Sequence, residues 1–472
     1  MSNKFIKDGM LLMIAKLFSM VSSALVAIFI ARYYGVSIYG AYTTAIAFTT
    51  FICTFTDLGL DSYMLKECSR NLDNLNKLYR NVMTIKLIIL LITSILIVLL
   101  SNLVGYEGDI KKLIIILLPN IMITYIINTF FVIMQVKGRL HINAKIQISQ
   151  NALIIIVALL TIIFKFNIYL YSLLQSIISI IVLCIYVYIS NMKFKPSIKY
   201  SKIIIKGSIL FGLSSLLYII YYKLDVVMLS VIKGKYEVGI YESAYKIINI
   251  IISVISILDN LVMPHFFRLF KENKKEMFKI YDRLIGASTI IGIPVSIAII
   301  YFSENIINIL YGSEYILASY VLKILSWSVC IRLFAAISGF VITASDNMKI
   351  KVKYQLIFAI VNILLNILFI PRIGVMGACI STIMTELLVF IMYYTFVLKE
   401  FNANINKSYV IKGILLNIIL VMIVFTFNRL NIFMKLVIFI SIYLILFAII
   451  FNKDYKKIKN QILVKMKSAT NI

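Results

Sequence analysis

The sequence has few charged residues and few of the side chains that metal sites and disulfides require. Only 14% of its 472 residues are Asp, Glu, Lys or Arg, against about 25% in soluble globular proteins. It contains two histidines and five cysteines, and no two cysteines form a CxxC pair. Neither a zinc site nor a disulfide framework follows from such a set. We therefore expect no metal and no cofactor.

Motifs of common catalytic sites are also missing. The sequence has no GxxxxGK[ST] phosphate loop, no GxSxG nucleophile elbow and no HExxH zinc motif. The segments between apolar runs are short, and the longest one on the predicted outer side covers only 303–316. A catalytic domain does not fit there, so we expect that the chain is not an enzyme.

Long apolar runs dominate what is present. Hydrophobic residues make up 62% of the chain, and the mean hydropathy is +0.99. Runs of about 18 or more apolar residues indicate membrane-spanning helices. The sequence thus predicts an all-α integral membrane protein surrounded by lipid. The fourteen predicted spans are 10–30, 40–60, 82–104, 113–136, 146–164, 168–190, 207–231, 238–264, 284–302, 317–343, 354–370, 375–398, 409–427 and 432–451.

The net charge of +27 is explained by membrane topology rather than by nucleic-acid binding, which we exclude. With the N-terminus in the cytoplasm, the inner segments hold roughly four times as many Lys and Arg as the outer segments, as the positive-inside rule requires. The alternation persists to the end of the chain. We expect both termini on the cytoplasmic side of the membrane that the spans cross.

Two segments that each link the first and second spans of a six-span block resemble each other. The repeat predicts an N-terminal six-helix lobe (1–200) and a C-terminal six-helix lobe (201–400), related by an axis near the membrane normal. Residues 401–472 would add two helices and a basic cytoplasmic tail. Four identities share one offset: Gly35 and Gly234, Gly40 and Gly239, Tyr42 and Tyr241, and Ala45 and Ala244.

Several ionisable side chains lie inside the seventh predicted span. A charge near the bilayer centre costs about 2.5–3.5 kcal/mol on insertion scales, so such residues usually face a bundle interior or a wet cavity. Ser214, Tyr218, Tyr221 and Asp225 form one helix stripe, which suits hydrogen bonding and flat contact with sugars. An ordinary polar seam between helices is the alternative. Lys223 would snorkel to the surface or cross to another helix.

Arg332 lies near the middle of the tenth predicted span. A guanidinium can hold a phosphate through two hydrogen bonds, which favours an anion-binding role. The alternative is a structural pair with an acidic side chain such as Asp225, Asp259 or Glu386.

Two further charges occur in the first and second predicted spans. Lys16 shares its helix face with Ser19 and Ser23, and it would either bind substrate or snorkel to the cytoplasmic surface. Asp57 shares a stripe with two threonines, and local hydrogen bonding is its alternative role. The predicted cavity leans cationic, which fits an anionic substrate. The weaker candidates for its lining are Asp259, Lys246, Lys323 and Glu386.

Segments spread over most of the chain resemble bacterial polysaccharide flippases of the Wzx type, in the superfamily that includes the MATE drug exporters. They are ARYYGVSIYGAY (31–42), DLGLDSYMLKE (57–67), the run from Tyr221 to Ile247, and VNILLNILFIPRIGVMGACIST (361–382). The resemblance implies a MATE-like, V-shaped transporter of two six-helix lobes around a central cavity. It also places Asp225 at the family's central Asp position.

The implied function is transfer of undecaprenyl-diphosphate-linked oligosaccharide repeat units to the outer leaflet, for capsule or O-antigen synthesis. A coupling cation, H⁺ or Na⁺, and a polysaccharide polymerase are the further partners of such a function. A MATE-type cation-coupled drug exporter, a lipid II flippase and a membrane enzyme are the alternatives. The exporter would want acidic cavity walls, and the enzyme would need a larger loop or domain.

Overall fold

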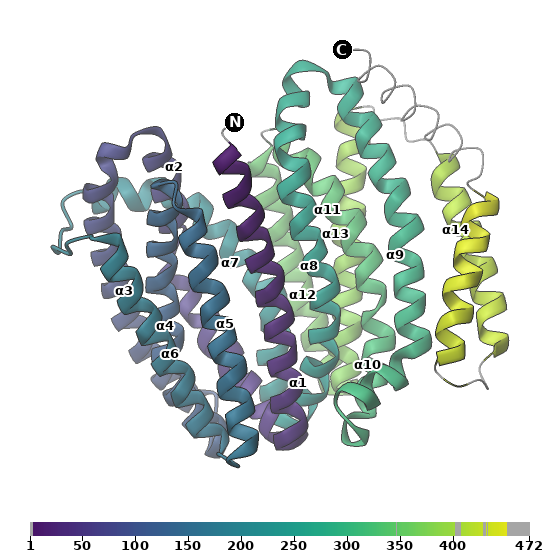
Figure 1. The fold of residues 1–472 in the computed structure, drawn as a ribbon, viewed down its shortest axis with the longest axis horizontal. Coiled ribbons are helices and arrows are strands. Elements are labelled where there is room, and N and C mark those ends of the chain that lie inside the picture. Colours follow the sequence, from purple (N-terminus) through teal and green to yellow (C-terminus); the bar gives the residue numbers. More distant parts are fainter. Residues whose placement is uncertain (1–2, 346, 402–406, 428–430, 432, 451–472) are drawn as a thin grey trace. The chain divides into compact units, whose positions relative to one another are not determined.

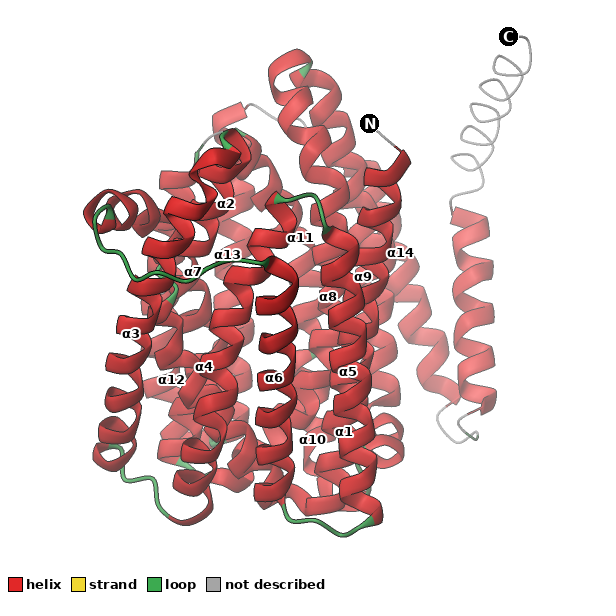
Figure 2. Ribbon diagram, turned by 60° about the vertical axis from the view of Figure 1, so that its left-hand side comes forward, coloured by secondary structure: helices red, strands yellow, loops and turns green. Residues whose placement is uncertain are grey.

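The computed structural model describes residues 3–345, 347–401, 407–427, 431 and 433–450. Helices account for nearly all of these residues, and the described segments contain no strand (Figure 2). This confirms the all-α prediction. The predicted basic tail at 451–472 lies outside the described residues, as do the side chains of Ser214 and Tyr218.

The helices follow one another through short turns (Figure 1). They are α1 (Asn3–Cys53), α2 (Leu60–Arg70), α3 (Leu75–Leu103), α4 (Gly108–Val136), α5 (Leu140–Ile163), α6 (Ile168–Ser190), α7 (Ser201–Ile232), α8 (Lys235–Glu272), α9 (Lys274–Leu310), α10 (Leu317–Leu325), α11 (Trp327–Ala344), α12 (Met348–Ile373), α13 (Val375–Phe401) and α14 (Lys407–Val424). Short 3₁₀ turns include η1 (Thr54–Thr56), and a last described helix covers Phe433–Ile450.

Eleven of the described helical segments are long and apolar enough to cross a membrane. Every predicted span coincides with a helix, but the correspondence is not one to one. Helix α1 contains the first predicted span and most of the second, α10 and α11 share the tenth, and α8 and α14 are not among the eleven. The multi-pass membrane architecture is therefore confirmed, whereas the count of fourteen stays a prediction.

Gly35 separates the two spans inside α1. Its backbone angles, φ 76° and ψ 174°, are far from helical values. A side chain at this φ would be strained, and glycine adopts it at little cost. The turn therefore depends on the same GVSIYG segment that the repeat analysis identified.

The second predicted span ends earlier than the prediction of 40–60. The α-helix stops at Cys53, a 3₁₀ turn follows, and α2 begins only at Leu60. Leu58 (φ 41°) and Gly59 (φ 77°) between them have left-handed backbone conformations. Asp57 thus lies in a break between helices rather than on a continuous helical stripe.

The chain divides into two compact units. The first comprises residues 1–257, 307–321 and 348–385, and the second comprises 258–306, 322–347 and 386–472. The first has an apolar core around residues such as Met64, Val82 and Ile133. A smaller cluster in the second unit includes Ile297, Phe302, Leu420 and Phe439. The predicted lobes at 1–200 and 201–400 are defined by the repeat instead, and they stay a prediction.

Two glycines at equivalent positions of the repeat meet inside the first unit. A Cβ on Gly40 would lie 1.8 Å from the carbonyl oxygen of Lys235, and a Cβ on Gly239 would lie 2.2 Å from that of Val36. Lys235 precedes Gly239 by the same four residues as Val36 precedes Gly40. Such a reciprocal contact is typical of a twofold relation, so it supports the predicted parallel repeat.

Candidate functional site

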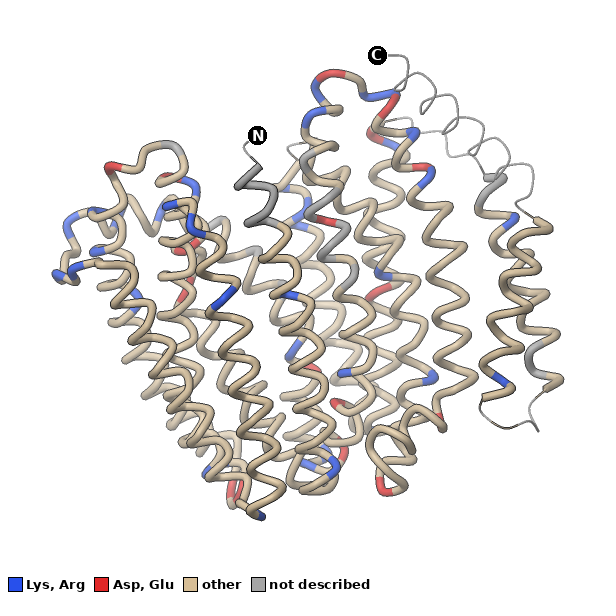
Figure 3. Tube along the Cα trace, in the orientation of Figure 1, with Lys and Arg blue, Asp and Glu red and all other residues tan. Residues whose placement is uncertain are grey.

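Charged residues are rare in the middle of the helices and frequent near their ends (Figure 3). Three clusters of buried charge stand out among the described residues. The Lys86 cluster contains Asp57, Asp61 and Lys86, and the Asp225 cluster contains Lys223, Asp225, Tyr241 and Glu242. The Arg332 pair consists of Arg332 and Glu386.

The Lys86 side chain is completely buried and surrounded by oxygen atoms. Its Nζ lies 2.9 Å from Asp57 Oδ1 and 2.6 Å from Asp61 Oδ2. It is also 2.9 Å from Thr129 Oγ1 and 3.3 Å from the carbonyl oxygen of Tyr125. An ammonium group has three N–H donors, so these four acceptors leave Lys86 no donor for a phosphate.

The sequence analysis missed Lys86 and Asp61. Lys86 stands within the apolar run 82–104, and this was the signal that could have identified it. Asp61 falls one residue beyond the predicted span 40–60, so it was not considered as a charge inside the membrane. Only the three-dimensional contact shows that both carboxylates share one lysine.

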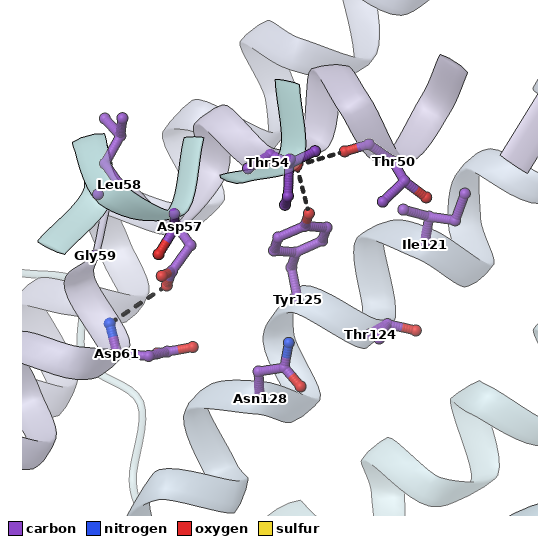
Figure 4. A pocket seen from close by; sticks show the side chains of 13 residues that line it. Thr50, Thr54, Asp57, Leu58, Gly59, Asp61, Ile121, Thr124, Tyr125 and Asn128 are labelled. Atoms are coloured by element: carbon purple, nitrogen blue, oxygen red, sulfur yellow. Dashed lines mark hydrogen bonds between the residues drawn. The ribbon is translucent and has the colours of Figure 1, made fainter. Parts of the chain in front are cut away.

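A cavity of about 370 Å³ lies beside this cluster (Figure 4). Thr54 Oγ1 donates to the carbonyl oxygen of Thr50 at 2.7 Å and lies 3.2 Å from the hydroxyl of Tyr125. Thr50, Thr54 and Asp57, predicted to form one stripe, therefore do line one space. The lining residues are Thr50, Thr54, Asp57, Leu58, Gly59, Asp61, Ile121, Thr124, Tyr125, Asn128, Gly212, Ser215 and Ile219.

The break that exposes Asp57 is held against α7 by a second close approach of glycines. A Cβ on Gly59 would lie 2.4 Å from the backbone nitrogen of Gly212, and one on Gly212 would lie 2.3 Å from the carbonyl carbon of Leu58. Side chains at either position would push α7 away from the break. The two glycines thus set one wall of the cavity.

Asp225 is 2% exposed and bonds within the helix bundle. It accepts a hydrogen bond from the Tyr241 hydroxyl, which also lies 3.3 Å from Thr382 Oγ1. Lys223 instead reaches Glu242, with 3.4 Å between Nζ and Oε1, and its side chain is 33% exposed. This arrangement of Asp225 is that of a polar seam between α7, α8 and α13, the alternative to sugar contact.

Tyr221, the other described member of the predicted stripe, is partly buried and meets Tyr222 edge to face at 4.6 Å between ring centroids. Tyr218 was also predicted to line the site, but its side chain is among those outside the description. The predicted stripe is therefore only partly visible.

Lys16 and Lys246 are brought to one face of α1. Lys246 Nζ donates to Ser23 Oγ at 2.7 Å, and Ser19 Oγ accepts from Asn151. Ser23 follows Lys16 by two helical turns, about 10 Å along the axis. Lys16 is exposed and forms no ion pair with another described residue.

Arg332 donates from Nε to Glu386 Oε1, and the two side chains are 4% and 2% exposed. This is the structural pair that the sequence left open as an alternative to phosphate binding. Lys323 pairs with Glu304 at 2.7 Å near the surface. Asp259 is exposed.

An ion pair and a hydrogen bond join helix ends beside the glycine crossing. Lys235 Nζ lies 2.6 Å from Asp109 Oδ2, and the Tyr169 hydroxyl donates to Asp109 Oδ1 at 2.8 Å. We call Asp109, Tyr169 and Lys235 the Asp109 latch. It connects α4, α6 and α8 at the end that the topology prediction assigns to the outer side.

Comparison with known families decides the relationship. Residues 5–270, more than half of the chain, match the model described as polysaccharide biosynthesis protein. The chain belongs to this polysaccharide biosynthesis family. Residues 211–368 also match the MatE model, which agrees with the predicted place of the family beside the MATE exporters.

Relatives of the chain occur in archaea and bacteria. It is 26% identical to the probable low-salt glycan biosynthesis flippase Agl15 of Haloferax volcanii over 195 residues, 41% of each chain. It is 25% identical to the capsular polysaccharide biosynthesis protein CapF of Staphylococcus aureus over 36% of this chain and 43% of CapF. The chain thus matches less than half the length of these two relatives.

Similar solved structures establish the fold of this chain. An inward closed conformation of the lipid II flippase MurJ has a TM-score of 0.82 and 19% identity, covering 94% of this chain and 99% of that one. An inward-facing MATE transporter of the MOP superfamily has a TM-score of 0.64 and 14% identity, covering 82% and 95%. The MATE-like transporter fold predicted from sequence is confirmed.

Proposed function

We propose that this chain moves undecaprenyl-diphosphate-linked oligosaccharide repeat units from the inner to the outer leaflet of a bacterial cytoplasmic membrane. Membership of the polysaccharide biosynthesis family and the fold shared with a flippase support this proposal. So does the name of the relative Agl15, a probable glycan biosynthesis flippase. Both termini of the chain would lie in the cytoplasm.

The observation that carries the proposal is that Lys16 of α1 and Lys246 of α8 lie beside one face of α1 without a carboxylate partner among the described residues, and we call these two residues the lysine face. A diphosphate that leaves water needs cations with free N–H donors. Lys86 and Arg332 donate to carboxylates, whereas Lys16 is exposed and Lys246 bonds to the neutral hydroxyl of Ser23. We therefore place the diphosphate at Lys16 and Lys246, with Lys223 as an auxiliary cation. Arg332 would have to leave Glu386 to take part.

Transport would proceed by alternating access of the two repeat halves. The Gly40–Gly239 crossing and the Asp109 latch hold helix ends together on the predicted outer side. Outward release would separate these contacts while the lipid tail stays in the bilayer. A gradient of H⁺ or Na⁺ would drive the cycle, and a polysaccharide polymerase would use the product.

A lipid II flippase is the second candidate function, favoured by the extent of the structural likeness to MurJ. Lipid II is also a polyprenyl diphosphate linked to sugars, so the lysine face suits it equally well. The two candidates differ in the headgroup, and a comparison of purified lipid-linked substrates separates them.

The purified chain in liposomes tests the proposal. We expect it to move an undecaprenyl-diphosphate-linked oligosaccharide, detected as accessibility to a glycosidase outside the vesicles. Lys16→Ala combined with Lys246→Ala should lower the initial rate about tenfold or more, the effect of losing a charge-assisted contact.

The matched control is Lys165→Ala, at an exposed lysine in the turn after α5, and it should leave the rate unchanged. An unchanged rate in the double variant would remove the lysine face from the substrate path. Movement of lipid II in preference to the oligosaccharide substrate would favour the second candidate.

A further inference from the structure

We propose that the cavity beside Asp57 binds a sugar ring that carries hydroxyl groups but no carboxylate, and that it disfavours acidic sugars. The inference rests on the proposed function in one respect, because it assigns this sugar to the transported glycan. The cavity lies entirely in the first unit, between the break at η1, α4 and α7 (Figure 4).

The size of the cavity suits a small polar ligand. Its volume of about 370 Å³ is near the lower end of the roughly 300–1,000 Å³ found for small-molecule sites. This is room for a sugar residue and a few waters, not for a lipid chain. Apolar contact comes from Ile121, Ile219 and the ring of Tyr125, and a flat aromatic face of this kind suits the C–H face of a sugar.

The polar groups of the cavity are mainly acceptors. The hydroxyls of Thr54, Thr124 and Ser215 donate their hydrogens to backbone carbonyls one turn earlier, at 2.7, 2.9 and 3.1 Å. Each oxygen therefore keeps at least one lone pair for a ligand, although Thr54 Oγ1 also accepts from the Tyr125 hydroxyl. Asp57 uses Oδ1 for Lys86, while its Oδ2 bonds to no described residue and the side chain is 25% exposed. A ligand rich in O–H or N–H donors complements this wall.

The balance of charge at the cavity disfavours an anionic ligand. Asp57 and Asp61 contribute two negative charges and Lys86 only one positive charge, all at the same cavity edge. Since Lys86 has no donor left, it cannot turn toward a phosphate or a uronic acid. A carboxylate in the cavity would face Asp57 directly, and like charges at such short distance repel strongly.

A metal ion is a poor fit for the same cluster. The ammonium group of Lys86 already occupies the position between the two carboxylates, at 2.9 and 2.6 Å. The described residues contain no group of three or more His, Cys, Asp or Glu side chains that could hold a metal. The neutral donor Asn128 adds an amide that can both donate to and accept from a sugar hydroxyl.

The cavity and the lysine face would each bind a different part of the substrate. Lys16 and Lys246 offer donors to the diphosphate, whereas the Asp57 cavity offers acceptors to the sugar. A glycan whose first residues are neutral would satisfy both sites, and an acidic residue at the cavity would not. The cavity is thus a specificity site within the proposed function.

Binding of free sugars to the purified full chain in lipid nanodiscs tests this inference without any transport step. The probes are radiolabelled N-acetylglucosamine and glucuronate, measured by equilibrium dialysis. We expect saturable binding of N-acetylglucosamine and at least about tenfold weaker binding of glucuronate. Absence of saturable N-acetylglucosamine binding, or equal binding of glucuronate, overturns the inference.

Two substitutions assign the binding to this cavity. Asn128→Leu keeps the side-chain size and removes the amide, so it should weaken N-acetylglucosamine binding about tenfold, the effect of a lost hydrogen bond to the ligand. The matched control Asn102→Leu changes an exposed asparagine at the end of α3, outside the cavity, and should have no effect. Equal binding by Asn128→Leu and the control contradicts the assignment.

A charge variant tests the second half of the inference. Asp57→Asn should reduce the discrimination against glucuronate about tenfold, because the exposed carboxylate oxygen loses its charge. Unchanged discrimination contradicts the role of Asp57. If Asn128→Leu does not fold, Thr54→Val, which is nearly isosteric, replaces it in the binding measurement.

The sugar-binding measurements and the transport measurement can fail independently of each other. A chain that moves the lipid-linked glycan but binds no free sugar refutes only the cavity inference. A chain that binds N-acetylglucosamine through Asn128 but moves no lipid-linked glycan refutes the flippase proposal and leaves the sugar site in place.

Discussion

The two most buried cations described above, Lys86 and Arg332, both donate to carboxylates. A bare charge inside a membrane protein is costly, and a nearby opposite charge offsets part of that cost. Lys16 is exposed and Lys246 donates to the neutral hydroxyl of Ser23. At the scale of the residue, the buried cations and those proposed to bind the substrate are therefore different residues.

The Arg332 pair provides a test of that separation. Arg332→Ala leaves Glu386 buried and unpaired, and breaking a buried pair typically costs about 3–5 kcal/mol. We expect a large loss of thermal stability, measured as the fraction of monodisperse protein after heating. The double variant Arg332→Met with Glu386→Leu should recover most of that stability, because neither member of the pair is left as an uncompensated buried charge.

Transport by the stable double variant decides between the two roles of Arg332. We expect it to move lipid-linked glycan at a rate near that of the unchanged chain. A stable double variant without transport would show that Arg332 contacts the substrate, as the phosphate interpretation of the sequence holds.

The sequence was a better guide to which charged residues lie within spans than to the residues with which they pair. Glu386 was named as one possible partner of Arg332, and Asp57 was placed on a stripe with the threonines that line its cavity. Lys86 and Asp61 were missed. Hydropathy shows that a charge lies within a span, but the partner depends on how neighbouring helices are rotated, and that information is absent from a single helix.

At the scale of the element, the predicted spans coincide with helices because each is a long apolar run with charged ends. The prediction erred between Thr54 and Gly59, where the apolar pattern continues although the backbone does not stay helical. A lone Gly after Asp and Leu is a weak signal for a left-handed turn. The close approach of Gly212 on α7, which uses that turn, lies more than a hundred residues further along the chain.

The glycine crossing between α1 and α8 is expected to tolerate no side chain. Gly40→Ala places a methyl group 1.8 Å from the carbonyl oxygen of Lys235, and such overpacking costs about 1–3 kcal/mol. We expect a lower thermal midpoint for Gly40→Ala and for Gly239→Ala, measured by loss of monodisperse protein on heating.

The matched control for this crossing is Gly339→Ala in α11. A Cβ there meets Tyr393 at an ordinary 3.4 Å, and alanine favours a helix over glycine. Its midpoint should stay the same or rise. Equal midpoints for Gly40→Ala and Gly339→Ala would mean that the crossing is looser than described.

At the scale of the whole molecule, the repeat was visible in the sequence as four identities, and the structure adds that two of the repeated glycines touch. Their reciprocal contact gives the repeat a physical meaning, because a twofold relation brings equivalent positions together. The predicted V shape and the lobe boundaries stay predictions. The Asp109 latch was not foreseen, since Asp109, Tyr169 and Lys235 lie at the starts of three separate helices.

The central claim is that lipid-linked glycan crosses the membrane by alternating separation of the repeat halves, and the latch offers its most direct test. Asp109→Cys and Lys235→Cys, in a chain whose exposed Cys184 is replaced by Ser, can be joined by a reducible bifunctional thiol reagent in liposomes. We predict that the joined protein moves no undecaprenyl-diphosphate-linked oligosaccharide and that reduction restores movement, while either single cysteine is unaffected. Equal transport by the joined and the reduced protein would contradict the account. So would the absence of transport by the joined protein, the reduced protein and the unchanged chain alike.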